Sequence, residues 1–150
     1  MTECSIAERK ILLSTKIIMF LPIIYSIFLP LKLGTAWFYT GLPIALIGLA
    51  LYTIVRVNLA TSSLDKEPAT KGLYRYSRHP VYLTGFLADV GVGIACAWWL
   101  FLLLTIVSII LTLFFVNIEE RFLLEKYGDT YREYMNRTPR WIGIAKSENL

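Results

Sequence analysis

The chain has 150 residues, of which 56% are hydrophobic and 17% are charged, and its mean hydropathy is +0.57. This length suits one domain rather than two, and the composition is more apolar than that of a soluble domain. The net charge of +4 is small, and we interpret it as a signal of membrane topology rather than of nucleic-acid binding. We therefore predict a single all-α, integral membrane domain over residues 1–150.

Four segments are apolar enough to be membrane spans, since a bilayer core needs roughly 20 mostly apolar residues per helix. The strongest segment contains no charged residue, whereas the third is short, rich in small residues and contains Asp89. An acid at that depth is costly, so we expect Asp89 to face the bundle interior, in either a functional or a structural role. The first segment is too long for a signal peptide and lacks a cleavage site. In chain order the predicted spans are 11–31, 35–56, 81–98 and 99–118.

The short connection between the last two spans predicts a tight hairpin, with Trp98 and Trp99 at the membrane interface. Lysine and arginine are concentrated before the first span, between the second and third, and after the fourth. This distribution predicts that both termini are cytoplasmic. The two polar segments, a loop at 58–80 and a C-terminal segment at 119–150, are then both cytosolic.

The loop ends in Arg78-His79-Pro80. A residue before proline avoids helical geometry, and proline is well tolerated at the first position of a helix. We therefore expect His79 to cap the third span and Pro80 to start it. Such a helix start attracts anions, and Arg78 adds positive charge. The alternative, a plain helix start whose arginines face phospholipid, stays open at this point.

The C-terminal segment opens with Glu119 and Glu120. If the helix continues through them, their side chains diverge by about 100°, so that one faces the bundle and the other faces water. Which of the two faces the bundle is not evident from the sequence.

An amphipathic helix is predicted after the two glutamates, because apolar and aromatic residues recur at spacings of four, four and three. The residues are Leu123, Tyr127, Tyr131 and Tyr134. Gly128-Asp129 is a predicted break, with the glycine closing one helix and the aspartate capping the next. The tyrosines fit a packed helix and a lipid interface equally well. The following residues 138–141 are expected to end the helix and fold back onto the bundle.

The chain has two cysteines and one histidine. Cys4 and Cys96 fall on opposite sides of the bilayer in the predicted topology, so we expect no disulfide. Neither cysteine has ligand spacing with His79, so we expect no metal site.

Several short motifs occur in a fixed order across the second half of the chain. This ordered series resembles the isoprenylcysteine carboxyl methyltransferase and phospholipid methyltransferase superfamily of integral membrane enzymes. The resemblance covers residues 65–142, about half of the chain. The motifs are Gly72-Leu73-Tyr74, Arg78-His79-Pro80-Val81-Tyr82 with Gly85, Glu119-Glu120, Tyr127-Gly128-Asp129-Thr130-Tyr131-Arg132-Glu133-Tyr134 and Thr138-Pro139-Arg140-Trp141.

The resemblance implies that S-adenosylmethionine is the methyl donor and that it binds at the cytosolic face. The candidate catalytic residues are Glu119, Glu120 and Arg78. Two positions differ from the eukaryotic prenylcysteine enzymes, which have histidine in place of Lys66 and a substrate-binding arginine in place of Phe115. The cofactor-binding residues implied by the resemblance are Lys66, Glu67, Pro68, Ala69, Tyr74, His79, Pro80, Val81, Tyr82 and Glu119.

The predicted function is methyl transfer to a lipid-like or prenylated acceptor that enters from the bilayer. A phospholipid N-methyltransferase is the nearest alternative. A sterol-reductase-like enzyme using NADPH is a second, but those enzymes have an Asp-x-x-Arg-Cys stretch where residues 117–121 read NIEER. A non-catalytic membrane adaptor is the third alternative.

Overall fold

The computed structural model describes residues 25, 31–64 and 67–144. All regular secondary structure in these residues is helical, which confirms the predicted all-α class for this part of the chain. The predicted first span lies outside the described residues apart from Tyr25 and Leu31. The elements are α2 (Ala36–Leu64), the short 3-10 helix η1 (Gly72–Arg75), α3 (Pro80–Cys96), α4 (Trp99–Tyr127) and α5 (Asp129–Arg137).

Two of the helices, α2 and α4, are long and apolar enough to cross a membrane. Many of their large apolar side chains are exposed, including Trp37 at 54% and Phe114 at 70%. A soluble helix of this composition would bury such a surface, whereas lipid covers it without cost. These helices therefore indicate a membrane protein. The third apolar helix, α3, has 17 residues.

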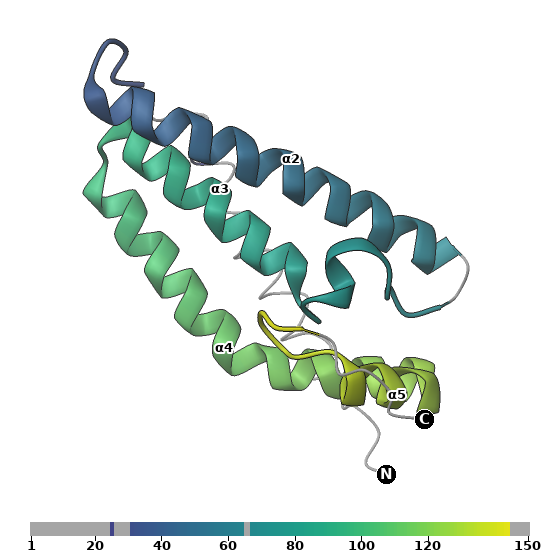
Figure 1. Cartoon of the computed structure of the whole chain (residues 1–150). Coiled ribbons are helices and arrows are strands. Elements are labelled where there is room, and N and C mark those ends of the chain that lie inside the picture. Colours follow the sequence, from purple (N-terminus) through teal and green to yellow (C-terminus); the bar gives the residue numbers. More distant parts are fainter. Residues whose placement is uncertain (1–24, 26–30, 65–66, 145–150) are drawn as a thin grey trace.

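Helices α2 and α3 lie side by side and approach most closely at small residues (Figure 1). A Cβ atom at Gly91 would overlap the backbone of Ala45, and one at Gly41 would overlap that of Ala95. At Gly85, by contrast, a Cβ atom would meet Tyr52 at an ordinary 3.8 Å. The backbones are therefore in contact near the C-terminal end of α3 and leave room for a side chain near its start.

Helices α3 and α4 form the predicted tight hairpin. Ala97 has a left-handed φ of 48°, and its N–H donates to Ile94 O at 2.9 Å. The Trp98 N–H donates to Gly93 O at 3.1 Å. These two bonds close α3 and leave two connecting residues before α4 starts. Figure 1 shows α4 leaving the hairpin at an angle to α3.

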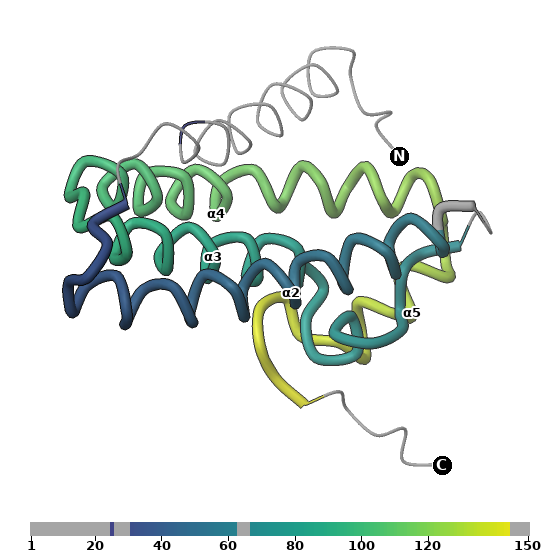
Figure 2. The backbone as a smooth tube through the Cα atoms, turned by 90° about the horizontal axis from the view of Figure 1, so that it is seen from above, coloured from purple at the N-terminus to yellow at the C-terminus, as the bar shows by residue number. Residues whose placement is uncertain are grey.

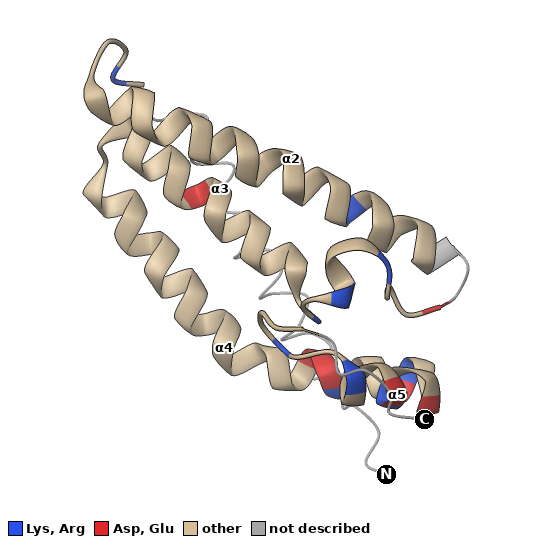
Figure 3. Cartoon of the chain, viewed as in Figure 1, with Lys and Arg blue, Asp and Glu red and all other residues tan. Residues whose placement is uncertain are grey.

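The opposite end of the helices contains η1, α5 and the last residues described, as two perpendicular views agree (Figures 1 and 2). Most charged residues of the described part also gather there (Figure 3). An apolar core joins these elements, and it is formed by the buried residues Val55, Tyr74, Tyr131 and Tyr134. We call it the second apolar core, because Cys96 and Phe101 form a first one at the hairpin. The lipid-interface interpretation is therefore wrong for Tyr131 and Tyr134, because tertiary packing buries them.

Two helices continue into the predicted polar segments. Helix α2 continues to Leu64 and α4 to Tyr127, so each extends beyond its predicted span. Apolar composition indicates which part of a helix lies within the bilayer core, whereas the helix itself ends only at a residue that breaks its hydrogen bonds. In α4 the first such residue is Gly128, with a φ of 59°. Asp129 is the first residue of α5 and makes no capping hydrogen bond, contrary to its predicted capping role.

Asp89 of α3 lies as the sequence predicted. Asp89 is 7% exposed and so faces the interior of the structure. Cys96 is buried as a free thiol, and Cys4 lies outside the described residues.

Candidate active site

The start of α3 provides the first wall of the site. His79 is the N-terminal cap and Pro80 the first helical residue, as predicted. The His79 N–H donates to Ser77 Oγ at 3.1 Å, and the Ser77 hydroxyl donates to Arg140 O at 3.2 Å. A side chain before the helix thus satisfies a backbone donor at the helix N-terminus, where N–H groups have no partner within the helix.

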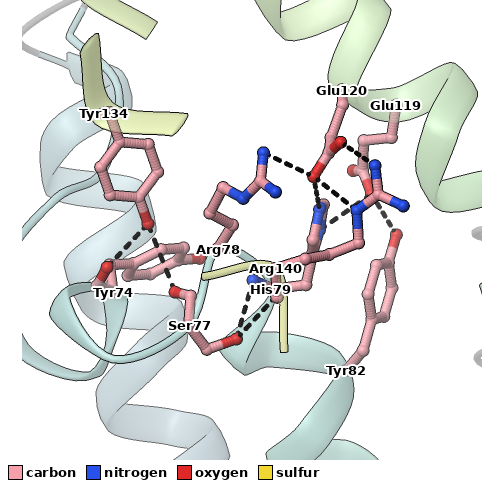
Figure 4. A network of polar contacts seen from close by, with 9 residues as sticks. All are labelled: Tyr74, Ser77, Arg78, His79, Tyr82, Glu119, Glu120, Tyr134 and Arg140. Carbon is pink, nitrogen blue, oxygen red and sulfur yellow. Dashed lines mark hydrogen bonds and ion pairs between the residues drawn. The ribbon is translucent and has the colours of Figure 1, made fainter. Parts of the chain in front are cut away.

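Glu120 lies at the centre of the polar network (Figure 4). One of its oxygens lies 3.2 Å from His79 Nε2 and 3.1 Å from Arg78 Nη1. Arg140 reaches both oxygens, with Nε at 3.2 Å and Nη2 at 2.6 Å. Glu120 is 3% exposed, whereas the Arg140 side chain that forms the forked contact is 37% exposed, so the network extends from the buried carboxylate to the surface.

These contacts set the charge of Glu120. Burial on its own raises the pKa of its carboxyl group, whereas hydrogen bonds from His79 and Arg140 lower it, as do the positive charges of Arg78 and Arg140. The net result is a pKa of about 2. Glu120 is therefore a carboxylate at neutral pH and a poor proton acceptor there.

Glu119 lies on the other side of the same imidazole. Its Oε2 accepts a hydrogen bond of 2.6 Å from the Tyr82 hydroxyl and lies 3.7 Å from His79 Nδ1. Its side chain is only 15% exposed, so Glu119 does not face water as one of the two glutamates was predicted to do. The two consecutive glutamates instead contact opposite nitrogens of His79.

Helix α5 holds η1 against this site. The Tyr134 hydroxyl donates to Tyr74 O at 2.7 Å and lies 3.3 Å from Ser77 O. Tyr74 itself is buried, and burial and the negative charge of Glu119 raise its pKa above the usual value. The pKa shift indicates that Tyr74 and Glu119 share one electrostatic environment.

Two side chains of the site each have a buried polar atom that makes no hydrogen bond or ion pair within the described part of the chain. The Tyr131 hydroxyl is one, and Arg78 Nε is the other. The negative charge of Glu120 adds to burial in raising the pKa of Tyr131, so this hydroxyl lies within the field of the polar network.

The predicted site residues fall into two groups. Arg78, His79, Tyr82 and both glutamates are joined by direct contacts. The other predicted residues make no direct contact with this network that the structure shows. Pro80 is buried, and Ala69, Tyr74 and Val81 belong to the second apolar core. Pro68 is half-buried, Glu67 is exposed with its N–H donating to Ser62 O, and Lys66 lies outside the described residues.

Four residues contribute to the site although they were not predicted as site residues from the sequence: Ser77, Tyr134, Arg140 and Trp141. The last two belong to residues 138–143, which we name the C-terminal strap. The predicted fold-back of this segment is confirmed, since the Arg78 N–H donates to Pro139 O at 3.0 Å. The sequence signal available was the helix stop at Thr138-Pro139 followed directly by a cation and an aromatic ring.

Comparison with known proteins identifies the class. The chain falls among the membrane methyltransferases of the isoprenylcysteine carboxyl methyltransferase and phospholipid methyltransferase superfamily. The family model described as phospholipid methyltransferase matches residues 29–130, more than half of the chain, so the chain belongs to that family.

A curated relative supports the same superfamily. The protein-S-isoprenylcysteine O-methyltransferase of Schizosaccharomyces pombe is 33% identical over 83 residues, which are 53% of this chain and 34% of the relative. The matched part thus spans about a third of that relative's length. No solved structure gives a significant match to this chain.

Proposed function

We propose that this protein transfers a methyl group from S-adenosylmethionine to a lipid-like or prenylated acceptor at the cytosolic face of a membrane. In this proposal one domain contains four spans, with residues 11–31 preceding α2, α3 and α4, and both termini are cytoplasmic. The main support is the convergence of the His79-Pro80 helix start and the glutamates of α4, since His79 lies between Glu119 and Glu120.

The residues of the site suit the donor. S-adenosylmethionine has a positively charged sulfur, ribose hydroxyl donors and a nucleoside ring. Glu119 is a partly exposed carboxylate, which attracts a cation and accepts hydrogen bonds from hydroxyls. Tyr82 and Trp141 are half-buried aromatic residues beside His79. The negative charge of Glu119 and the aromatic surface of Tyr82 and Trp141 therefore both suit S-adenosylmethionine, the donor that the family implies.

When bound, S-adenosylmethionine supplies an electrophilic methyl group next to a sulfonium cation. The side chains of the protein hold the walls of the site in position around the donor. Glu120 and Arg78 act in this proposal as positioning residues, because their mutual contact and the contact with His79 fix the start of α3. Among the predicted catalytic residues, Glu119 is then the one that contacts the reactants.

The acceptor determines whether Glu119 also moves a proton. A carboxylate or thiolate acceptor needs no base, and its reaction with a sulfonium destroys both charges, which a site of low dielectric favours. An amine acceptor, as in phospholipid N-methylation, must first lose a proton, and Glu119 is placed to accept it. In this proposal the lipid part of the acceptor enters the site from the bilayer.

Binding of labelled S-adenosylmethionine to the purified protein in nanodiscs tests the proposal. We expect saturable binding that His79→Ala and Glu119→Gln reduce by at least about tenfold. Glu125→Gln is the matched control, because Glu125 is an exposed acid on the same helix. Absence of binding to the folded wild-type protein would contradict the proposal.

Two further measurements separate the alternatives. Thermal stabilisation by NADPH instead of S-adenosylmethionine would favour the reductase alternative, and stabilisation by neither would favour the adaptor. Incubation of membrane lipid extracts with labelled donor, followed by mass spectrometry, identifies the methylated acceptor.

A further inference from the structure

The C-terminal strap lies outside the part of the chain that the family model matches, which ends at residue 130. Three backbone contacts fix it to the segment before α3. The Arg78 N–H donates to Pro139 O at 3.0 Å, the Gly143 N–H donates to Tyr76 O at 3.0 Å, and the Ser77 hydroxyl donates to Arg140 O at 3.2 Å. The strap is therefore an ordered wall beside the site rather than a loose tail.

Arg140 anchors the strap from its other side. Its guanidinium makes the forked contact with Glu120, at 3.2 and 2.6 Å. Glu120 also contacts His79, so one carboxylate connects α4, the start of α3 and the strap. Since a planar fork fixes direction as well as distance, this contact restrains the backbone that positions Trp141.

Trp141 brings a third ring to the site. Its centroid lies 6.0 Å from that of His79, and the Tyr82 ring stacks on the same imidazole at 5.8 Å. The Tyr82 hydroxyl donates to Glu119, whose Oε2 lies 3.7 Å from His79 Nδ1. Both rings and this carboxylate thus lie around the His79 imidazole, and we name this group the aromatic corner. Faces of tryptophan and tyrosine attract cations, and a carboxylate strengthens the preference.

We propose that Trp141 is a donor-binding residue that favours the positively charged donor over its neutral thioether product, and that Arg140 is the positioning residue that holds it there. This inference rests on the proposed function. After methyl transfer the sulfur is neutral, so the aromatic corner loses its attraction for the product. The strap thereby provides selectivity between donor and product as well as enclosure.

The test compares the dissociation constants of S-adenosylmethionine and S-adenosylhomocysteine, measured by calorimetry on the full chain in nanodiscs. We expect Trp141→Leu to weaken donor binding about fivefold while product binding changes less than about twofold. Trp141→Phe should retain most of the selectivity. Trp99→Leu is the matched control, because Trp99 is 75% exposed at the hairpin end.

Equal weakening of donor and product by Trp141→Leu would overturn the inference and leave the proposed function standing. Binding of neither ligand to the wild-type protein would instead refute the proposed function. If Trp141→Leu does not fold, incorporation of tetrafluorotryptophan at this position keeps the shape and removes the negative ring face. An unchanged donor-to-product ratio in that variant would also overturn the inference.

A double-mutant cycle tests Arg140. Arg140→Lys keeps the charge but loses the fork, so we expect it to reduce the donor-to-product selectivity in the same direction as Trp141→Leu. In the Trp141→Leu background the same change should have no further effect on that ratio. Equal effects of Arg140→Lys in both backgrounds would show that it does not act through Trp141.

Discussion

Glu119 and Glu120 are adjacent and chemically identical, yet their surroundings give them different properties. Glu120 contacts Arg78, His79 and Arg140, which lower its pKa to about 2. Glu119 accepts a hydrogen bond of 2.6 Å from the Tyr82 hydroxyl. The helical rotation of about 100° between consecutive residues is enough to separate the two environments.

The first prediction concerns the buried ion pairs. Glu120→Gln should lower the free energy of unfolding by about 3 kcal/mol, because it leaves buried cations without their carboxylate. Urea unfolding in detergent measures the change, with the exposed Glu125→Gln as control. A loss no greater than that of the control would contradict the network as described.

The depressed pKa also predicts a pH dependence. Since the carboxyl of Glu120 has a pKa of about 2 in the folded protein and 4.5 as its ordinary value, the stability that it contributes is fully present above about pH 4.5. That contribution should be lost as the pH falls from about 4.5 to 2. The Glu120→Gln variant should lack this part of the acid sensitivity, which melting temperatures across the range measure.

A matched pair of tyrosines gives the second prediction. Tyr131→Phe removes a buried hydroxyl that has no hydrogen-bond partner among the described residues, so stability should stay constant or rise by about 1 kcal/mol. Tyr134→Phe removes the donor to Tyr74 O and should cost about 1 kcal/mol. Unfolding measurements on both variants provide the comparison, and a larger loss in Tyr131→Phe would contradict it.

At the scale of elements, small residues decide how α2 and α3 pack. A Cβ atom fits at Gly85 but overlaps backbone at Gly91. The two helices are therefore in backbone contact along one part of their length and separated by the Tyr52 side chain along another. The separated part lies next to the start of α3, where the site is.

The third prediction follows from this difference. Gly91→Ala forces the helices apart and should destabilise the protein by about 1–3 kcal/mol, the usual cost of overpacking. Gly85→Ala should change stability by less than about 0.5 kcal/mol. Thermal unfolding in nanodiscs measures both, and similar losses for the two variants would disprove the difference in packing.

At the scale of the whole molecule, the site requires segments from across the described chain. The loop before α3, α4, α5 and the strap converge at one end, and the α3–α4 hairpin lies at the other (Figure 2). Charged residues follow the same division (Figure 3). This polarity supports the proposed orientation, in which the charged end is cytosolic.

The fourth prediction tests that orientation. A cysteine introduced at the exposed Glu133 of α5 should react with an impermeant maleimide only from the cytoplasmic side of the membrane. A cysteine at the exposed Trp99 should react only from the opposite side. Labelling of intact cells and of inside-out vesicles measures both, and the reverse pattern would overturn the proposed topology.

The helical class, the hairpin, the start of α3 at Pro80 and the break at Gly128 could all be predicted from the amino-acid sequence. These features follow local rules, because proline and glycine act on their own backbone and apolar composition reports the environment of a single helix. The second apolar core was only partly evident, since the tyrosine spacing gave a helix face without showing what would cover it.

The set of side chains that contact Glu120 could not be predicted from the sequence and is evident only in the folded chain. His79 is 41 residues away from it and Arg140 is 20, so no spacing rule connects them. Their contact depends on how α4 leaves the hairpin and how the strap returns. Which side chains contact each other over such separations depends on how the whole chain folds. The contacts of Arg140 and Trp141 were therefore evident only in the structure.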